Sequence, residues 1–334
     1  MLWQPGALAC AGAPSLSTDG LIAPTPVPIG AAQFTAPFSS VTVTFDLDAE
    51  GRPFSITGTA EPRARFYALD IMPALRASRF AGSGPRTGCT LTYTPEVLGI
   101  ADAPLKVLAR YGVAQRARLE RQIWERFAEG DCHSEKRLAP LQIAYPDWRK
   151  IERRVGDPKW TYVRYDVDTG GVPVNLATVL SSGDPALDAE AQRAVAESRY
   201  AGGPRTGCVR MWWQGPETVP VALPESPVGN PACEIDDRWE RAPRLTYPRP
   251  YQSRAIEGWA ALRFDVAPWG EIGAVEVIEA QPSSEFGDAA IAVLRAAKFK
   301  PLDTGLKGCV DRVSFRIRKD AGEEAAGDLL SPAD

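Results

Sequence analysis

The chain has 334 residues, enough for two or three domains of ordinary size, and its 44% hydrophobic content excludes wholesale disorder. A formal net charge of -4 without a Lys/Arg block argues against a nucleic-acid-binding domain, and no apolar run is long enough for a transmembrane helix. The single histidine, His133, argues against histidine zinc sites and against Ser-His or Cys-His catalysis.

The N-terminus carries no complete signal peptide, but Ala7-Leu8-Ala9 stands directly before Cys10 as an A-x-A pattern. A true start upstream would make Cys10 the first mature residue. A lipidated Cys10 is an alternative to a disulfide-bonded one. Export is therefore an expectation that no complete signal sequence supports.

The first predicted unit spans 10–98. Alternating apolar and polar residues at 41–48 predict a half-buried strand, and a second strand follows at 53–56. The helix expected over 65–79 is interrupted by Pro73, which should shorten or kink it. A Gly/Pro turn ending in Gly88-Cys89 leads into a closing strand at 90–94.

Segment 101–131 belongs to no unit. It reads as one long helix after Pro104, with a modest apolar stripe among alternating charges. We expect a linker helix that packs on the first and second units. The alternative is a helix that docks a partner.

The second predicted unit spans 132–216 and repeats the order of the first. Strands at 161–168 and 172–175 precede a helix over 184–200, with Asp184-Pro185 as N-cap and first residue. The closing strand contains Trp212-Trp213. Because neighbouring residues of a strand point to opposite faces, one of these two should face solvent or a neighbouring unit.

A Pro-rich linker at 214–231 leads to the third predicted unit, 232–319. Strands at 261–266 and 272–278 come before a helix whose apolar face includes Phe286 and Leu294. The closing strand follows Cys309, at 310–318. The acidic tail, 320–334, is predicted to be disordered.

The six cysteines fall into three pairs at nearly one spacing. The separation is 79 residues for Cys10 and Cys89, and 76 residues for both Cys132–Cys208 and Cys233–Cys309. Repeat symmetry alone favours one disulfide in each of three β-β-α-β units, since sequence cannot fix connectivity. Six buried reduced thiols are the alternative, and the absence of any Cys-x-x-Cys argues against a metal site.

The third unit resembles the C-terminal domain of the TonB family of energy transducers. The resemblance runs through Tyr247-Pro248, the strand 258–266, Gly270-Glu-Ile272, the helix, Lys298-Phe299 and Val313-Ser-Phe-Arg-Ile317. The second unit keeps Tyr145-Pro146 and the first keeps least. The resemblance implies an α+β fold of about three tandem TonB C-terminal-like units with small antiparallel sheets, plus a linker helix. It also implies a periplasmic setting, although no membrane anchor or Pro/Lys-rich spacer is seen.

Candidate chemistry is sparse. The pairs Asp46/Asp48 and Asp166/Asp168 read as solvent-facing strand charges, and the Gly-rich phrases at 82–88 and 202–207 read as turns rather than phosphate loops. His133 is expected at the surface or in a cap. We find no nucleophile–base pair, so we expect no enzyme, no catalytic residue, no metal and no cofactor.

Two functions follow. The first is a periplasmic binding or scaffold protein associated with TonB-dependent outer-membrane transport, which docks an extended peptide by β-augmentation. The resemblance implies a transporter or another envelope protein as partner, with no nucleic acid and no evident small-molecule substrate. The peptide-binding edge would consist of Tyr247, Pro248, Val310, Arg312, Val313, Ser314, Phe315, Arg316 and Ile317. The alternative is a disulfide-hardened structural envelope protein without a peptide ligand. A free edge at 310–318 favours binding, and an edge paired to another unit favours the structural role.

Overall fold

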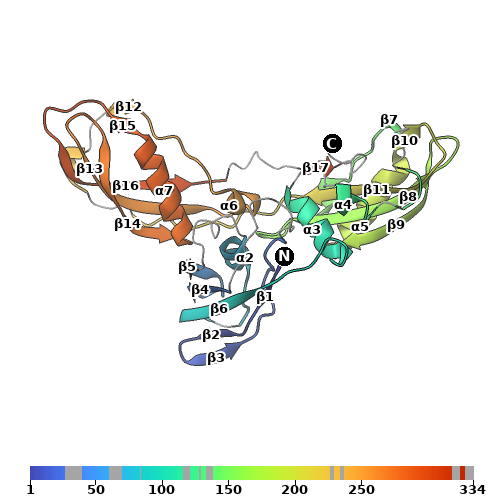
Figure 1. The fold of residues 1–334 in the computed structure, drawn as a ribbon, viewed down its shortest axis with the longest axis horizontal. Coiled ribbons are helices and arrows are strands. Elements are labelled where there is room, and N and C mark those ends of the chain that lie inside the picture. Colours follow the sequence, from blue (N-terminus) through green and yellow to red (C-terminus); the bar gives the residue numbers. More distant parts are fainter. Residues whose placement is uncertain are drawn as a thin grey trace.

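The structure is a computed structural model of the chain. It describes residues 1–26, 40–59, 70–82, 84–115, 121–127, 129–132, 138–225, 229–233, 237–317 and 324–327. Within this part, helices combine with antiparallel sheets, which confirms the predicted α+β class. The three larger sheets lie in three lobes (Figure 1), which we call unit 1 (10–98), unit 2 (132–216) and unit 3 (232–319).

The sheet of unit 1 contains β4 (Val41–Leu47), β5 (Pro53–Thr59) and β6 (Arg86–Glu96), with helix α2 (Ile71–Ala77). In β4 every second residue is buried, as the alternation predicts. Helix α2 is short and accommodates Pro73 within its first turn, where a missing N–H costs nothing. The chain before Ser17 adds strands that the sequence did not predict: β1 (Leu2–Pro5), β2 (Leu8–Cys10) and β3 (Ala13–Leu16).

The sheet of unit 2 is covered on both faces. Its strands are β8 (Lys159–Val167), β9 (Pro173–Ser181) and β11 (Arg205–Gln214). Helix α5 (Pro185–Glu197) lies on one face, where Trp212 is fully buried. Trp213 is buried on the other face, among residues of the segment 103–127. The two tryptophans thus lie on opposite faces of the strand, but Trp213 faces the segment 103–127 rather than solvent or a neighbouring unit.

The predicted long helix at 101–131 is described only in part, and the described residues after Trp124 are not helical. Helix α3 (Leu105–Gln115) and the single turn α4 (Arg121–Trp124) occupy this segment, and 116–120 lie outside the described residues. Leu108, Val113, Ile123 and Phe127 pack against the sheet of unit 2. The segment thus supplies the second cover of this sheet, and it reaches unit 1 through Arg110, which donates to the Ala23 carbonyl.

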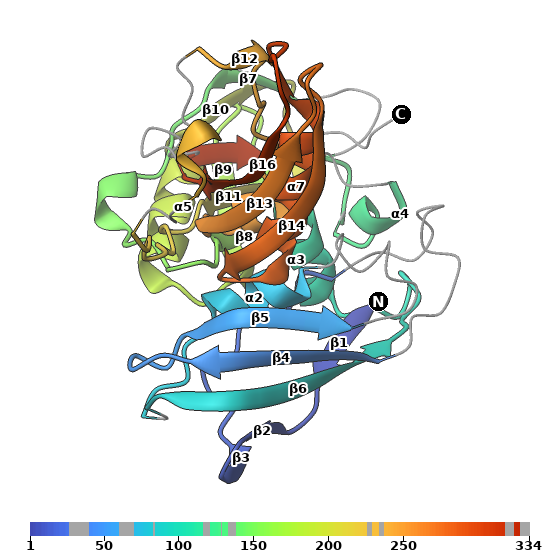
Figure 2. The same cartoon turned by 90° about the vertical axis from the view of Figure 1, so that its left-hand side faces the viewer.

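The sheet of unit 3 has the order β14 (Ile272–Gln281), β13 (Gly258–Val266), β16 (Leu306–Phe315). Helix α7 (Ser284–Ala296) packs on it through an apolar face that includes Phe286 and Leu294. The core of unit 3 is continuous with that of unit 1. At this junction the Ile56 amide donates to the Pro282 carbonyl at 2.8 Å, and α2 lies between the two sheets (Figure 2).

Small two-stranded ladders complete units 2 and 3. β7 (Ala139–Gln142) pairs with β10 (Arg199–Ala201), and β12 (Trp239–Arg241) pairs with β15 (Lys298–Phe299). Three short helices lie before strands of these units: η1 (Trp148–Lys150), η2 (Pro231–Cys233) and α6 (Arg249–Ser253).

The same hydrogen bonds recur in the three units. Glycines in the left-handed region precede each second cysteine, and the amides of Gly88, Gly207 and Gly308 donate to Asp46, Asp166 and Asp265 at 2.9, 2.8 and 2.9 Å. A second set of hydrogen bonds also recurs in the three units. The carbonyls of the hairpin glycines Gly51, Gly171 and Gly270 accept from the amides of Phe80, Tyr200 and Phe299. Asp46 and Asp166, expected to be solvent-facing strand charges, are half-exposed and also accept hydrogen bonds from these turn amides.

Disulfides join Cys10 to Cys89, Cys132 to Cys208 and Cys233 to Cys309. These are the pairs that the repeat symmetry predicts. Each ties the segment that enters a unit to the closing strand of the same unit.

The tail differs from its prediction. Glu324–Gly327 forms β17, which pairs antiparallel with Met211–Gln214 of β11 in unit 2. For these four residues the expectation of disorder is wrong, because the outer edge of β11 offers unpaired backbone groups with which they pair. No helix in the described part of the chain is both long and apolar enough to cross a bilayer.

Candidate functional site

The candidate site is the outer edge of β16, the closing strand of unit 3. β16 pairs with β13 along one side, from Leu306 to Phe315. No described strand pairs with its other side. The sheet therefore ends at β16, as the resemblance predicted.

The half of this edge around Cys309 is covered by the chain entering unit 3. The Asn230 side-chain amide donates to the Lys307 carbonyl at 2.9 Å, and Cys233 is bonded to Cys309. Arg238 forms an ion pair with Asp311 at 2.6 Å. Val310, predicted to bind peptide, lies under this cover, since a Cβ on Gly229 would come within 2.9 Å of its backbone nitrogen.

The half of the edge after the cysteine is different. Arg312 donates to the Pro224 carbonyl at 2.5 Å, which anchors the preceding linker beside the strand. Val313 and Ser314 are half-buried. Among the residues described, none forms a ladder with Arg312–Phe315 on the outer side.

The closing strands of units 1 and 2 are completed by the ends of the chain. In unit 1, β1 pairs with Tyr93–Glu96 of β6. In unit 2, β17 pairs with Met211–Gln214 of β11. Both ladders lie on the half that follows the cysteine. Of these three comparable edges, only that of β16 carries no described strand.

Several of the predicted site residues belong to the core rather than to an exposed groove. Phe315 is fully buried and packs on Phe286, with ring centroids 5.2 Å apart. Tyr247 packs on Phe315 at 5.6 Å, and its hydroxyl donates to the Ile256 carbonyl at 2.5 Å. Burial raises the pKa of Tyr247. Tyr247 and Phe315 therefore fix the position of the edge from behind, and Pro248 is the N-cap of α6.

The end of the edge is held by Glu257. Its carboxylate pairs with Arg316 and accepts from the Ile317 amide at 3.2 Å. Glu257 itself is buried. The structure thus brings Tyr247 together with residues 312–317, whereas Val310 lies beneath the covering segment and Pro248 begins α6.

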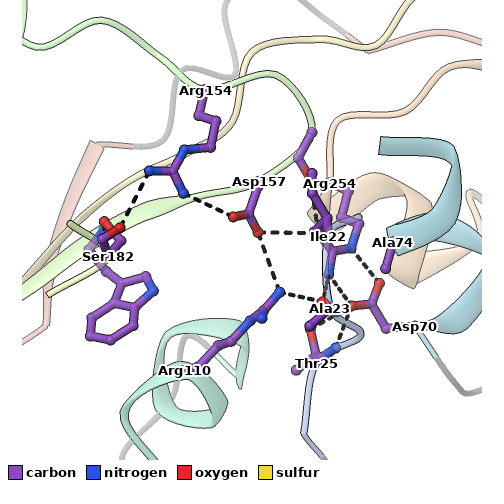
Figure 3. A network of polar contacts seen from close by, with 12 residues as sticks. Ile22, Ala23, Thr25, Asp70, Ala74, Arg110, Arg154, Asp157, Ser182 and Arg254 are labelled. Carbon is purple, nitrogen blue, oxygen red and sulfur yellow. Dashed lines mark hydrogen bonds and ion pairs between the residues drawn. The ribbon is translucent and has the colours of Figure 1, made fainter. Parts of the chain in front are cut away.

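A buried charge cluster that the sequence analysis missed joins the three units (Figure 3). Arg254, at the end of α6, donates to Asp70 through Nε at 2.6 Å and to Asp157 through Nη1 at 3.3 Å. It also donates to the Gly156 carbonyl at 3.0 Å. Burial alone would lower the pKa of Arg254, but Asp70 and Asp157 more than offset this and raise it.

The cluster is closed by further partners. Asp70, which precedes α2, accepts from the Thr25 amide at 2.8 Å, and Asp157 lies 3.2 Å from Arg154 and 3.6 Å from Arg110. No periodicity or motif marks these residues in the sequence. The only signal available was the separate appearance of each charge beside a predicted helix or strand.

The described residues contain no group of three or more His, Cys, Asp or Glu side chains placed to hold a metal ion. His133 lies outside the described residues. Glu285 is a strongly perturbed carboxyl, because its burial in the first turn of α7 raises its pKa to about 8.

This strand edge and the aromatic residues behind it lie in a segment that matches a known protein family. Residues 243–318 match the family model for the Gram-negative bacterial TonB protein C-terminal. The match covers the strands β13 to β16 and the helices α6 and α7 of unit 3, and the family is periplasmic. It supports a TonB-like envelope protein that interacts with envelope or outer-membrane proteins. No curated protein matches the chain.

Proposed function

We propose that the protein is a periplasmic TonB-like binding or scaffold protein that docks an extended peptide on the outer edge of β16. The observation that carries this proposal is the outer edge of Arg312–Phe315, with which no described strand pairs, within the segment that matches the TonB family. An added strand would form main-chain hydrogen bonds there, and alternate side chains would contact the two faces of the sheet.

The peptide would come from a TonB-dependent outer-membrane transporter or another envelope protein. Three intrachain disulfides fit an oxidising compartment, which agrees with the periplasmic setting of the family. The structure does not favour the alternative of a purely structural protein, because no described strand of another unit pairs with β16.

We further propose that units 1 and 2 are diverged copies of unit 3. The order of two strands, a helix and a closing strand recurs in each. The glycine–aspartate bond before each second cysteine also recurs, and so does the disulfide. Such copies share a scaffold, while their closing strands differ in what occupies the edge.

Two proline variants test the docking site. Successive residues of β16 direct their N–H groups alternately toward β13 and outward. Of Val313→Pro and Ser314→Pro, one therefore removes an outward N–H donor and leaves the hydrogen bonds to β13 intact. A sheet tolerates proline only at such an edge position. The probe is a set of synthetic peptides that cover the periplasm-facing N-terminal segments of the host's outer-membrane transporters.

We expect at least one peptide to bind the native chain and to protect the amides of 312–315 from hydrogen exchange. The proline variant that keeps the native melting temperature should lose this binding. Arg263→Gln serves as the control, because Arg263 lies on β13, away from the edge, and pairs with the exposed Glu276. Binding that survives both prolines, or protection elsewhere, would contradict the proposed site.

A further inference from the structure

The C-terminal strand β17 occupies the edge of unit 2 that corresponds to the open edge of unit 3. The register places Gly327 opposite Met211, Ala326 opposite Trp212 and Ala325 opposite Trp213. Without β17, the outer side of Met211–Gln214 would have no described strand beside it. The start of β11 is instead covered by residues 131–132. The Thr206 amide donates to the Asp131 carboxylate, and the Cys132 amide donates to the Thr206 carbonyl.

The residues of β17 are poor strand formers. Glu324, Ala325, Ala326 and Gly327 all belong to the types depleted in strands. The strand β1, which closes the corresponding edge of unit 1, is different because it carries the buried anchor Trp3. The two strands therefore differ: β1 brings a buried tryptophan to its edge, whereas the residues of β17 have low strand propensity.

The edge beneath β17 is well formed. Met211, Trp212, Trp213 and Gln214 are all buried, so the strand is fixed from both faces of the sheet. Beside it, the ring of Tyr145 packs on Trp212 with centroids 5.5 Å apart, yet 58% of Tyr145 is exposed. An incoming strand with a large apolar side chain opposite Trp212 could cover this ring, and β17 has alanine at that register position.

We propose that Met211–Gln214 of β11 is a second strand-acceptor site, kept closed by the chain's own residues 324–327. The occupant that opens it is an extended peptide of another protein, with a β-branched residue at the register position of Ala326. This inference concerns unit 2 and stands whether or not β16 binds a peptide.

The physical basis is competition between a tethered and a free strand. The tail is attached to unit 3, so its effective concentration at β11 is on the order of millimolar. A free peptide at a lower concentration can displace the tail only if its side-chain contacts make it bind the edge more tightly. A β-branched or aromatic cross-strand pair contributes roughly 0.2–1 kcal/mol relative to alanine, and several such pairs along four residues would shift the balance.

The test uses the full chain with Ala325→Pro and Ala326→Pro together, which removes two backbone donors from β17. The matched control is Leu329→Pro with Leu330→Pro, which places the same two prolines beyond Gly327, the last described residue of β17. The probes are a capped synthetic peptide of residues 320–330, the same peptide with Ala326→Ile, and a scrambled peptide. The readouts are peptide affinity by fluorescence anisotropy and hydrogen exchange of amides 211–214.

We expect faster exchange at 211–214 in the Ala325/Ala326 variant alone. That variant should bind the 320–330 peptide at least about tenfold more tightly than the native chain and the control do. The Ala326→Ile peptide should bind roughly two- to fivefold more tightly still. Binding should restore slow exchange at 211–214, and the scrambled peptide should not.

Equal affinities for the three chains would overturn the proposal, as would protection that appears at β16 instead of β11. A native dimer that becomes monomeric in the Ala325/Ala326 variant would show that the tail pairs between copies. That result would overturn the assignment of an intrachain closure.

Discussion

Replacement of Arg254 by methionine should destabilise the protein severely. The Arg254 side chain is only 4% exposed, and those of its partners Asp70 and Asp157 are 13% and 17% exposed. Solvent therefore screens these charges little. Removing one member of a buried ion pair leaves an uncompensated charge, and the usual cost is about 3–5 kcal/mol.

The measurement is urea denaturation at neutral pH, followed by tryptophan fluorescence and by circular dichroism. Arg254→Met should lower the free energy of unfolding by about 3–5 kcal/mol, because Asp70 would keep its Thr25 hydrogen bonds but lose its buried cationic partner. Arg254→Lys is the matched control. It keeps the charge but loses the planar fork that contacts two carboxylates, so we expect a smaller loss.

A double-mutant cycle with Asp70→Asn separates the pairwise interaction from other effects of the substitution. The two changes together should cost less than the sum of the single costs by at least about 1 kcal/mol. A loss below about 1 kcal/mol for Arg254→Met, or strict additivity in the cycle, would refute the account of this cluster as the junction of the three units.

Three further predictions concern single sites. Burial raises the pKa of Glu285 to about 8 against an ordinary value of 4.5, so the folded form retains a proton that the unfolded chain releases. The free energy of unfolding should therefore fall as the pH rises from about 4.5 to 8. In denaturation curves, Glu285→Gln should remove this fall, with a gain of several kcal/mol at pH 8 and little at pH 4.5. Equal pH profiles of the native chain and the variant would contradict this prediction. Gly171→Ala should lower the melting temperature more than Gly183→Ala does. Both residues have positive φ, but a Cβ on Gly171 would lie 1.9 Å from the Tyr200 carbonyl oxygen, and one on Gly183 meets nothing within 4 Å. Equal decreases would show that the contact with Tyr200 is unimportant. Trp213→Ala should cost roughly 3–5 kcal/mol by opening a cavity between β11 and the segment 103–127, whereas a loss under 1 kcal/mol would mean that this cover is not packed.

The repeated elements were predictable because their signals are local. Alternation in Val41–Leu47 and the N-cap Asp184 each report a nearby physical requirement. The cysteine pairing, across 76–79 residues, was predictable only because the spacing repeats. The adjacent tryptophans also constrained the fold, since strand geometry forces Trp212 and Trp213 to opposite faces.

The remaining features depend on contacts between distant segments. Arg254 and Asp70 are 184 residues apart, and neither lies in a pattern that marks it for burial. The tail strand Glu324–Gly327 has low strand propensity, so only the vacant edge of β11 explains its conformation. The packing of the segment 103–127 on the sheet of unit 2 likewise joins distant parts of the chain, and the apolar stripe alone could not locate it.

In the described part of the chain, β1 and β17 pair with two of the three comparable strand edges, and no strand pairs with the edge of β16. Hydrogen exchange resolved to single amides in the unliganded native chain tests this difference most directly. We expect fast exchange of the outward amides within Arg312–Phe315, and slow exchange of those within Tyr93–Glu96 and Met211–Gln214, which pair with β1 and β17. Equal protection at all three edges would contradict the account, because β16 would then be covered as its counterparts are.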